Sequence, residues 1–141
     1  MLSLPIRSVL EPRKLVVAAP RCSVAHAAAL MRAERVAAVL VVEDDRLLGI
    51  FTERDALFRV LADGRDPRTT RLADVMTPRP QTIHPDEPFV RALRMMHDGS
   101  FRHLPVVEFD RPLGVVSVRD ALDEDLHELR IDIEQRETMG E

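Results

Sequence analysis

The apolar positions of the chain follow the same succession of periods in two separate stretches. In each stretch, four apolar residues at positions i, i+3, i+4 and i+7 come first, which is the spacing of one face of an α-helix. Each stretch therefore predicts an amphipathic helix. The four residues are Val24, Ala27, Ala28 and Met31 in the first stretch and Phe89, Ala92, Leu93 and Met96 in the second.

Two short apolar runs follow each predicted helix, with turn-forming residues between them, and this pattern predicts a β-hairpin. A further helix is predicted after each hairpin. With a short strand before the first helix, each unit is β-α-β-β-α. The runs are 39–42 and 47–51, then 104–107 and 113–116, with turns at 44–45 and 110–112. The residues expected to face inward on the last helices are Ala56, Leu57, Val60 and Leu61, then Leu122, Leu126, Leu129 and Ile133.

The two stretches are copies of one another. Residues 20–57 align with residues 85–122 at a constant shift of 65, and fourteen of the 38 aligned positions are identical. Residues 6–13 match 72–79 at a shift of 66. A unit of about sixty residues has a marginal core, so we expect the copies to pack together. The sequence thus predicts an α+β fold of two β-α-β-β-α repeats with pseudo-twofold symmetry, residues 1–70 and residues 71–141, the second with a C-terminal helix.

Composition narrows the functional classes. A net charge of −4, with acidic and basic residues interspersed, provides no surface for a polyanion, so nucleic acid is not an expected partner. The apolar runs are much shorter than the roughly 20 residues of a membrane span, and the first ten residues lack a signal sequence, so no membrane association is expected. A single cysteine, Cys22, excludes an internal disulfide. A cytoplasmic location is therefore expected.

The most informative local pattern occurs once in each copy, where the second strand meets the following helix. Residues 49–55 and 114–120 both place a hydroxyl residue three positions after a glycine and an aspartate three positions after the hydroxyl. One interpretation is a helix capping box, in which hydroxyl and carboxylate bond the first main-chain N–H groups. The other is a nucleotide site, because a hydroxyl at a helix start suits phosphate and a carboxylate accepts two sugar hydroxyls.

Nothing in the sequence indicates catalysis. The histidines form no His-x-x-x-His pair with a neighbouring glutamate, so no metal site is expected. Glycine-rich phosphate loops are absent. We therefore expect no catalytic residues and no enzyme, and a nucleotide would be sensed rather than turned over. The histidines are His26, His84, His97, His103 and His127.

At these motifs the chain resembles the tandem cystathionine-β-synthase (CBS) domain pair, also called a Bateman module, and the resemblance covers nearly all of it. The segments that carry it are Asp74-Val-Met-Thr77, Thr82-Ile-His-Pro85, Arg102-His-Leu-Pro-Val-Val107 and the two Gly-x-x-(Thr/Ser)-x-x-Asp stretches. The resemblance implies two clefts between the repeats that bind adenosine nucleotides. Asp55 and Asp120 would hold ribose, and Thr52 and Ser117 would face phosphate.

The resemblance also implies further ligand contacts. Val16 or Gln81, together with Ile50 and Val115, would flank adenine. Arg102 and His103 match positions that carry basic side chains toward phosphates in several family members. Their counterparts in the first copy are Ala37 and Ala38, so the two clefts should differ in charge.

These observations favour a stand-alone regulatory module that binds an adenine nucleotide or other adenosyl ligand and signals to a separate, unidentified effector protein. No cofactor would be required, and AMP, ADP or ATP would be the regulatory ligand. A homodimer is expected through the helices that follow the hairpins. One alternative is a ligand-independent dimeric scaffold in which the Thr52/Asp55 and Ser117/Asp120 pairs serve only as caps. Another is a small nucleotide hydrolase or transferase that uses His103 as its base.

Overall fold

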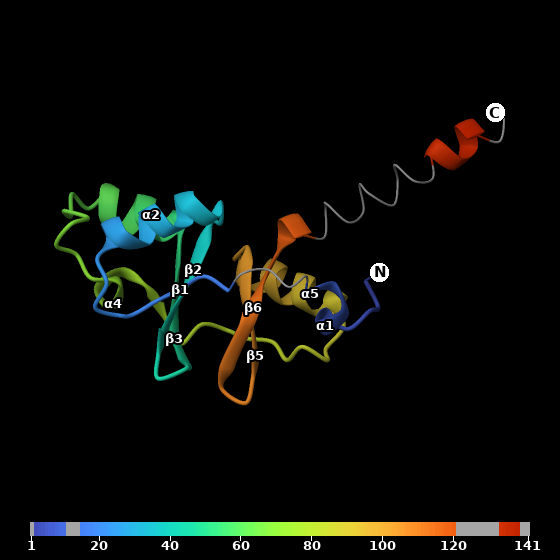
Figure 1. The fold of residues 1–141 in the computed structure, drawn as a ribbon, viewed down its shortest axis with the longest axis horizontal. Helices are drawn as coiled ribbons and strands as arrows, with labels where there is room; N and C mark the ends of the chain where they lie inside the picture. The colour runs from blue at the N-terminus through green and yellow to red at the C-terminus, as the bar shows by residue number, and fades with distance from the viewer. Residues whose placement is uncertain (1, 11–14, 121–132, 139–141) are drawn as a thin grey trace.

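The computed structural model describes residues 2–10, 15–120 and 133–138 (Figure 1). It shows two similar halves whose hairpins lie side by side. The helices are α1 Ile6–Val9, α2 Val24–Glu34, α3 Glu53–Asp55, the π-helix η1 Ala56–Leu61, α4 Leu72–Val75 and α5 Phe89–Gly99. The strands are β1 Val17–Ala18, β2 Ala38–Glu43, β3 Arg46–Thr52, β4 Thr77–Pro78, β5 His103–Glu108 and β6 Arg111–Ser117.

The two sheets share a hairpin and a parallel pairing beside it, but the first has four strands and the second has two. In the first sheet, β1 runs parallel to β2, β2 and β3 form an antiparallel hairpin, and β4 adds to the far edge. In the second, β5 and β6 form the hairpin and Ile83 makes a parallel bridge to Val106. The pair Ala18 and Val41 in the first sheet corresponds to Ile83 and Val106 at the shift of 65. The predicted α+β fold of two repeats is confirmed.

The two long helices pack as the spacing predicts, with one exception. In α5, Phe89, Ala92 and Met96 are buried and Leu93 packs against them. In α2, Val24 and Ala27 are buried, but Ala28 is exposed, so its predicted inward position is wrong. The alanine-rich sequence of α2 does not distinguish its faces. Leu30 and Met31, which are larger, cover the core instead.

Both hairpins turn through two residues with left-handed backbone, the type I′ turn that matches strand twist. The φ angles are 52° and 62° at Asp44 and Asp45, and 53° and 63° at Phe109 and Asp110. The turn predicted at residues 110–112 is therefore displaced by one residue, since Arg111 and Pro112 already belong to β6. Phe109 is 90% exposed at the tip.

Each repeat places its leading helix on the core of the other repeat. Ile6 of α1 is buried in the core that contains Phe89 and Leu104, and its main-chain N–H donates to the Glu87 carbonyl at 2.9 Å. Leu72 of α4 is buried in the core of the first repeat, and its N–H donates to the Cys22 carbonyl at 2.8 Å. Figure 1 shows α1 beside α5 and α4 in the opposite half. The leading helices are therefore exchanged.

A glycine stands where each exchanged segment crosses a hairpin. A Cβ atom at Gly49 would lie 2.5 Å from Met76 Sδ and 2.8 Å from the Thr77 carbonyl oxygen. At Gly114 it would lie 3.1 Å from Leu10 Cδ2. Met76 and Leu10 occupy matching positions at the shift of 66. The two glycines thus permit the close crossing, although Gly49 has much less room than Gly114.

The faces of the two hairpins meet in an apolar interface cluster. Ala38, Leu40 and Ile50 are buried there, with Val42 and Leu47 packed beside them and Val115 contributed by β6. The buried residues come from both strands of the first hairpin, and Val115 is in the second repeat. The interface cluster therefore holds the repeats together across the pseudo-twofold axis.

The helix after the first hairpin differs from its prediction. Val60 is buried and Ala56 packs on the core, but Leu57 is 50% and Leu61 73% exposed, so their inward positions are wrong. Phe58 is also exposed, with the Arg54 guanidinium 5.3 Å from its ring centroid. Only the Ala56 and Val60 face of this short helix reaches the core. In the second repeat, Leu122, Leu126 and Leu129 lie outside the described residues, and Ile133 is 47% exposed.

None of the described helices has the length and apolar character needed to cross a membrane.

Candidate functional site

Thr52 and Asp55 form a complete capping box at the start of α3. The Asp55 carboxylate accepts the Thr52 main-chain N–H at 2.9 Å and the Thr52 hydroxyl at 3.2 Å. The Asp55 N–H donates to Thr52 Oγ1 at 3.3 Å. Arg59 Nε lies 3.6 Å from the other carboxylate oxygen of this buried aspartate. The capping interpretation of this motif is therefore realised in the fold.

Ser117 and Asp120 repeat this arrangement in the second half. The Ser117 N–H donates to Asp120 Oδ2 at 2.9 Å, and the Asp120 N–H donates to Ser117 Oγ at 3.3 Å. The hairpin delivers each hydroxyl at the last residue of its second strand, and the helix begins at the next residue. The two motifs thus present a hydroxyl and a carboxylate in equivalent positions.

His103 lies where parts of both repeats come together. In the ladder it faces Ser117, whereas the matching partner of Thr52 is Ala38. Burial lowers the pKa of His103 below its ordinary value, the carboxylates of Glu53 and Asp120 oppose that change, and Arg102 adds to it. The ladder places this imidazole opposite Ser117 at the second helix start, and the carboxylate of Glu53 at the first helix start also acts on its pKa. Glu53 was not predicted from the sequence, although it directly follows Thr52.

Arg102 is exposed beside His103. Its carbonyl accepts the Val118 N–H at 3.3 Å, as the Ala37 carbonyl accepts the Glu53 N–H at 3.0 Å in the first repeat. The backbone is thus alike at both positions. Only the second repeat adds an exposed cationic side chain and a titratable imidazole.

The residues predicted to flank adenine are dispersed. Ile50, only 5% exposed, and Val115 are together in the interface cluster. Val16 packs against the core of the first repeat instead, where its carbonyl accepts the Leu40 N–H at 3.1 Å. Gln81 is exposed ahead of Ile83. A ring held against Ile50 would therefore need the interface cluster to open.

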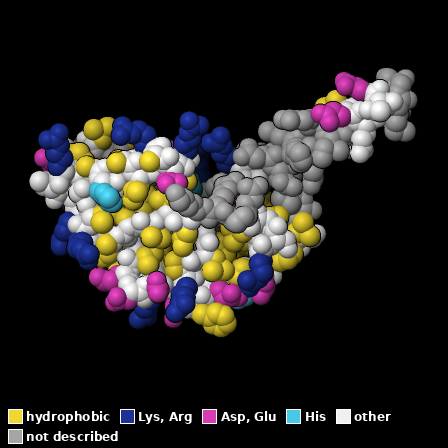
Figure 2. All heavy atoms as spheres, in the orientation of Figure 1, with side chains coloured by type: hydrophobic (Ala, Val, Ile, Leu, Met, Phe, Trp, Pro, Cys, Tyr) yellow, Lys and Arg dark blue, Asp and Glu magenta, His cyan; other side chains and the backbone are white. Residues whose placement is uncertain are grey.

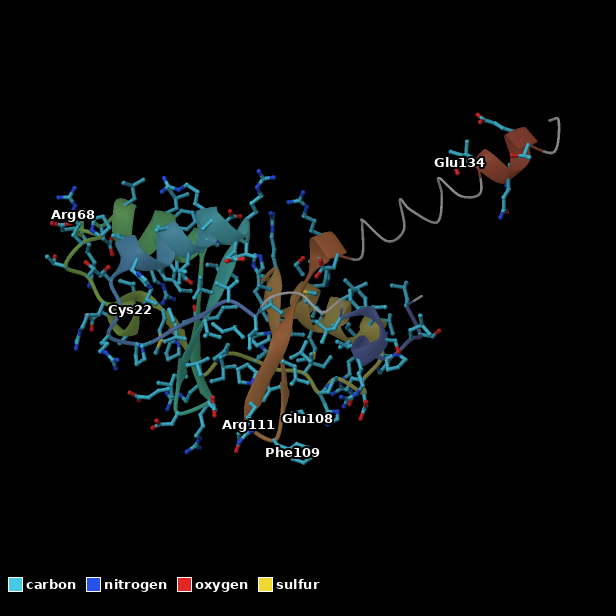
Figure 3. The ribbon with its side chains drawn as sticks, in the orientation of Figure 1. Cys22, Arg68, Glu108, Phe109, Arg111 and Glu134 are labelled. Atoms are coloured by element: carbon cyan, nitrogen blue, oxygen red, sulfur yellow. The ribbon has the colours of Figure 1, made fainter. Side chains whose placement is uncertain are left out.

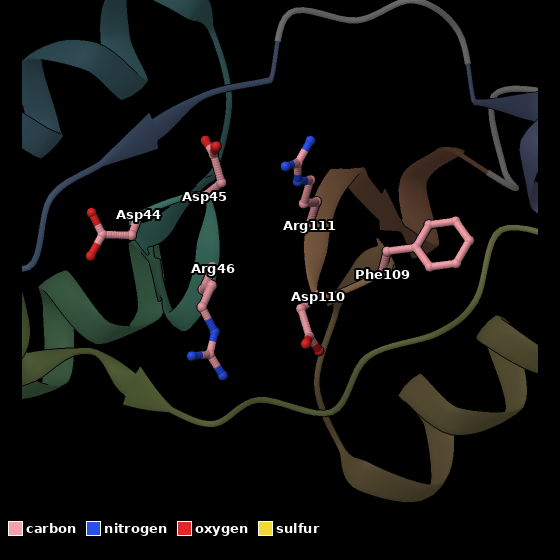
Figure 4. Close-up of a pocket in the computed structure, with 6 residues that line it drawn as sticks. All are labelled: Asp44, Asp45, Arg46, Phe109, Asp110 and Arg111. Atoms are coloured by element: carbon pink, nitrogen blue, oxygen red, sulfur yellow. The ribbon is translucent and has the colours of Figure 1, made fainter.

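An open hollow of about 440 Å³ lies at the other ends of the hairpins, between their turns (Figure 4). In the close-up, Asp45 and Arg111 point the same way from opposite sides, and Arg46 and Asp110 point the other way. None of the predicted site residues lines this hollow. It is lined by Asp44, Asp45, Arg46, Phe109, Asp110 and Arg111.

Within the described part of the chain, one group of side chains has the composition and spacing of metal ligands: His84, Asp86 and Glu108. It lies on the second repeat and includes no predicted site residue. The hydrogen bond from Arg7 holds the pKa of Asp86 below its usual range. The sequence signal was His84-x-Asp86, two potential ligands two positions apart in a turn before α5, but Glu108 and Arg7 are distant in sequence and only the fold brings them close.

Comparison with known proteins identifies the same domain twice in the chain. A model described as the CBS domain matches residues 6–62 and 72–127. The CBS domain-containing protein CBSCBSPB1 of Arabidopsis thaliana is 38% identical over 112 residues, which are 79% of this chain and 20% of that protein. Among the first curated relatives, the chain spans between about a fifth and a half of their length.

Solved structures share the fold. A putative signal-transduction protein with CBS domains from Burkholderia ambifaria superposes with a TM-score of 0.81 at 26% identity, covering 87% of this chain and 94% of that one. The CBS domain protein PAE2072 from Pyrobaculum aerophilum, complexed with AMP, gives 0.76 at 22% identity and covers 83% and 89%. The second likeness concerns the fold alone.

Proposed function

Because the chain belongs to the CBS domain family and carries two copies of the domain in tandem, we propose that it is a regulatory module that binds an adenine nucleotide or other adenosyl ligand between its repeats. The observation that carries the proposal is the paired hydroxyl and carboxylate at equivalent helix starts. The AMP complex of PAE2072 supports the choice of ligand class. The output passes to a separate effector protein, and no turnover is expected.

In this proposal each aspartate has two roles. Asp55 and Asp120 keep the main-chain N–H of the preceding hydroxyl residue bonded through one carboxylate oxygen. The other oxygen accepts the ribose hydroxyls, which is the pairing that a carboxylate makes with a vicinal diol. Thr52 and Ser117 then direct their hydroxyls toward phosphate. At Asp55 the ribose has to share that oxygen with Arg59.

The second repeat should bind the phosphate end more strongly. Arg102 is exposed there, and the pKa of His103 is influenced by Glu53 and Asp120, whereas the first repeat has Ala37 and Ala38 at these positions. Burial favours neutral His103 in the free protein, while a phosphate dianion nearby favours the protonated ring. Ligand binding should therefore be accompanied by proton uptake. Titration calorimetry of AMP in two buffers of different ionisation enthalpy measures this uptake, and His103→Gln should abolish it.

We also propose that the module is a homodimer through the helix that follows the first hairpin. Leu57, Phe58 and Leu61 form an exposed apolar face on this helix. Ligand binding can signal through such a dimer only if it favours one arrangement of the repeats over another. Sedimentation should show a dimer that Leu61→Glu dissociates.

The deciding experiment is titration calorimetry with AMP, ATP, NAD and S-adenosylmethionine on the wild type, Asp55→Asn and Asp120→Asn. Asp98→Asn is the matched control, because it removes the same charge from an exposed aspartate on α5. We expect saturable binding of one ligand, at least tenfold weaker in Asp120→Asn and unchanged in Asp98→Asn. Saturable binding that neither aspartate variant weakens would contradict the assigned sites.

A ligand-independent scaffold is the second candidate, and the complete capping boxes together with the buried Ile50 favour it. On this reading, both aspartate variants lose about 1 kcal/mol of unfolding free energy, as caps do. None of the four ligands would give heat or raise the melting temperature. That combination would leave the scaffold as the function.

A further inference from the structure

A four-residue cluster on the second repeat joins the N-terminal helix to the body of the molecule. Arg7 of α1 donates from Nε to Asp86 Oδ1 at 3.0 Å and from a terminal nitrogen to Glu108 Oε2 at 2.6 Å. His84 lies between the carboxylates, with Nδ1 3.7 Å from Asp86 Oδ2 and Nε2 3.5 Å from Glu108 Oε2. Figure 3 shows Glu108 near the turn of the second hairpin.

The first repeat cannot form this cluster. The residues that match His84, Asp86, Glu108 and Arg7 are Ala19, Arg21, Glu43 and Ala73, so only the glutamate is retained. The exchange of leading helices is common to both repeats, yet α4 holds its place without such a group. The cluster is therefore not required by the fold, and its chemistry needs a separate explanation.

The three acceptor residues suit a divalent transition metal ion. One imidazole and two carboxylates are ligands that Zn²⁺ takes readily, at about 2.1 Å, which separates tetrahedral ligand atoms by about 3.4 Å. One ligand atom from each residue lies within 4.8 Å of the others, so a shift of about 1 Å in these exposed side chains would bring them to the tetrahedral separation. Nδ1 of His84 is 3.7 Å from Asp86 and Nε2 is 3.5 Å from Glu108, so an ion on either nitrogen already has one carboxylate beside it. All three side chains are accessible to an ion from solvent.

The histidine is also oriented for metal binding. Nδ1 faces the Asp86 carboxylate and Nε2 faces the Glu108 carboxylate, so either nitrogen can bind an ion together with its neighbouring acid. At present Nδ1 accepts the Asp86 main-chain N–H at 3.1 Å, a bond that an ion on Nδ1 would replace.

Charge explains the presence of Arg7. The guanidinium supplies one positive charge to two carboxylates, which leaves one negative charge without compensation inside the cluster. A divalent ion would balance both. We propose that His84, Asp86 and Glu108 form a Zn²⁺ site and that Arg7 is the cation that holds the site when zinc is not bound. Zinc and the Arg7 side chain then compete for the same two carboxylates.

The test titrates tag-free protein with zinc chloride by calorimetry and with cobalt chloride by visible absorption at pH 7.5. We expect one ion per chain, with cobalt bands of a nitrogen and oxygen site and no thiolate charge transfer from Cys22. Glu108→Gln and His84→Gln should each weaken binding at least tenfold. Arg7→Ala should bind about two- to fivefold more tightly, the size of an exposed ion pair. Arg71→Ala is the matched control, because Arg71 pairs with Asp74 on the other half.

Three outcomes would overturn the proposal. One is no saturable binding by the folded wild type or Arg7→Ala, and a second is binding that Glu108→Gln and His84→Gln leave unchanged. A third is an equal affinity for zinc in Arg7→Ala and Arg71→Ala, which would show that Arg7 does not compete with zinc for the carboxylates. Circular dichroism and the melting temperature confirm that each variant is folded. The cluster contains none of the residues assigned to the nucleotide, so its test is independent of the proposed function.

Discussion

The two repeats share their backbone arrangement and differ in individual side chains, several of them exposed and one, His103, partly buried. Strand register, capping boxes, left-handed turns and exchanged helices all recur at the shifts of 65 and 66. The differences are Phe109 for Asp44 at the exposed turn, Arg102 and the partly buried His103 for Ala37 and Ala38, and the cluster around His84. The comparison teaches that equal halves maintain the fold, while the second half carries most of the distinctive polar chemistry.

The largest expected effect comes from emptying an exchanged core position. Ile6→Ala and Leu72→Ala each remove a fully buried side chain, which should cost about 3 kcal/mol of unfolding free energy. Because the helices are exchanged, Ile6→Ala should reduce hydrogen-exchange protection in α5, β5 and β6, and Leu72→Ala in α2 and β2. Loss of protection in the repeat that contains the mutated residue by sequence would contradict the exchange.

The two crossing glycines provide the next contrast. Gly49→Ala should cost about 2 kcal/mol, because the new methyl group meets the Thr77 carbonyl, which belongs to the main chain and cannot turn away. Gly114→Ala should cost less than about 1 kcal/mol, since the Leu10 side chain can shift by a few tenths of an ångström. Urea denaturation measures both. Equal costs would show that the two crossings are equivalent after all.

The hairpin turns allow a reciprocal exchange of residues. Phe109→Asn should raise the unfolding free energy by about 0.5–1 kcal/mol, because asparagine tolerates left-handed backbone better and the exposed ring loses little packing. Asp44→Phe, at the matching position of the first hairpin, should lower it by a similar amount. Thermal and urea unfolding measure the pair, and a destabilised Phe109→Asn would reveal packing of that ring.

The smallest effect concerns pH. The pKa of His103 is lowered in the folded state, so the unfolded chain binds more protons below the ordinary value of 6.5. The unfolding free energy should therefore rise with pH up to about 6.5. As pH falls below that value, the protonated histidine of the unfolded chain should make the folded protein less stable. The difference between wild type and His103→Gln, followed by melting temperature from pH 5 to 8, isolates this group. An unchanged difference across that range would place His103 in an exposed environment.

Sequence periodicity predicted the helices and strands well, because each element is determined mainly by residues that are close together in the sequence. Helix spacing, apolar runs and the shift of 65 are local features or direct repeats, and they gave both hairpins and both long helices. Burial within a helix was less certain where residues are small, as at Ala28, or where a short helix touches the core on a narrow face, as at Leu57 and Leu61. The burial of those side chains depends on which other elements pack against the helix.

The site was predicted in part for the same reason. The pairing of Thr52 with Asp55, and of Ser117 with Asp120, lies within four residues and follows from helix capping. The approach of Glu53 to His103, and of Arg7 to Glu108, joins residues from different repeats. No local spacing encodes those contacts, because they depend on how the halves pack and on the exchange of the leading helices.

That exchange sets a condition on any shorter form of the chain. In a molecule with one repeat, the leading helix would have no core of another repeat to pack on. Its own core would lack the isoleucine or leucine that the other repeat supplies. Its core could be filled only if it exchanged leading helices with a second molecule, as in a domain-swapped dimer. Joining two such molecules through a loop like residues 62–70 would give the present fold without building any new core.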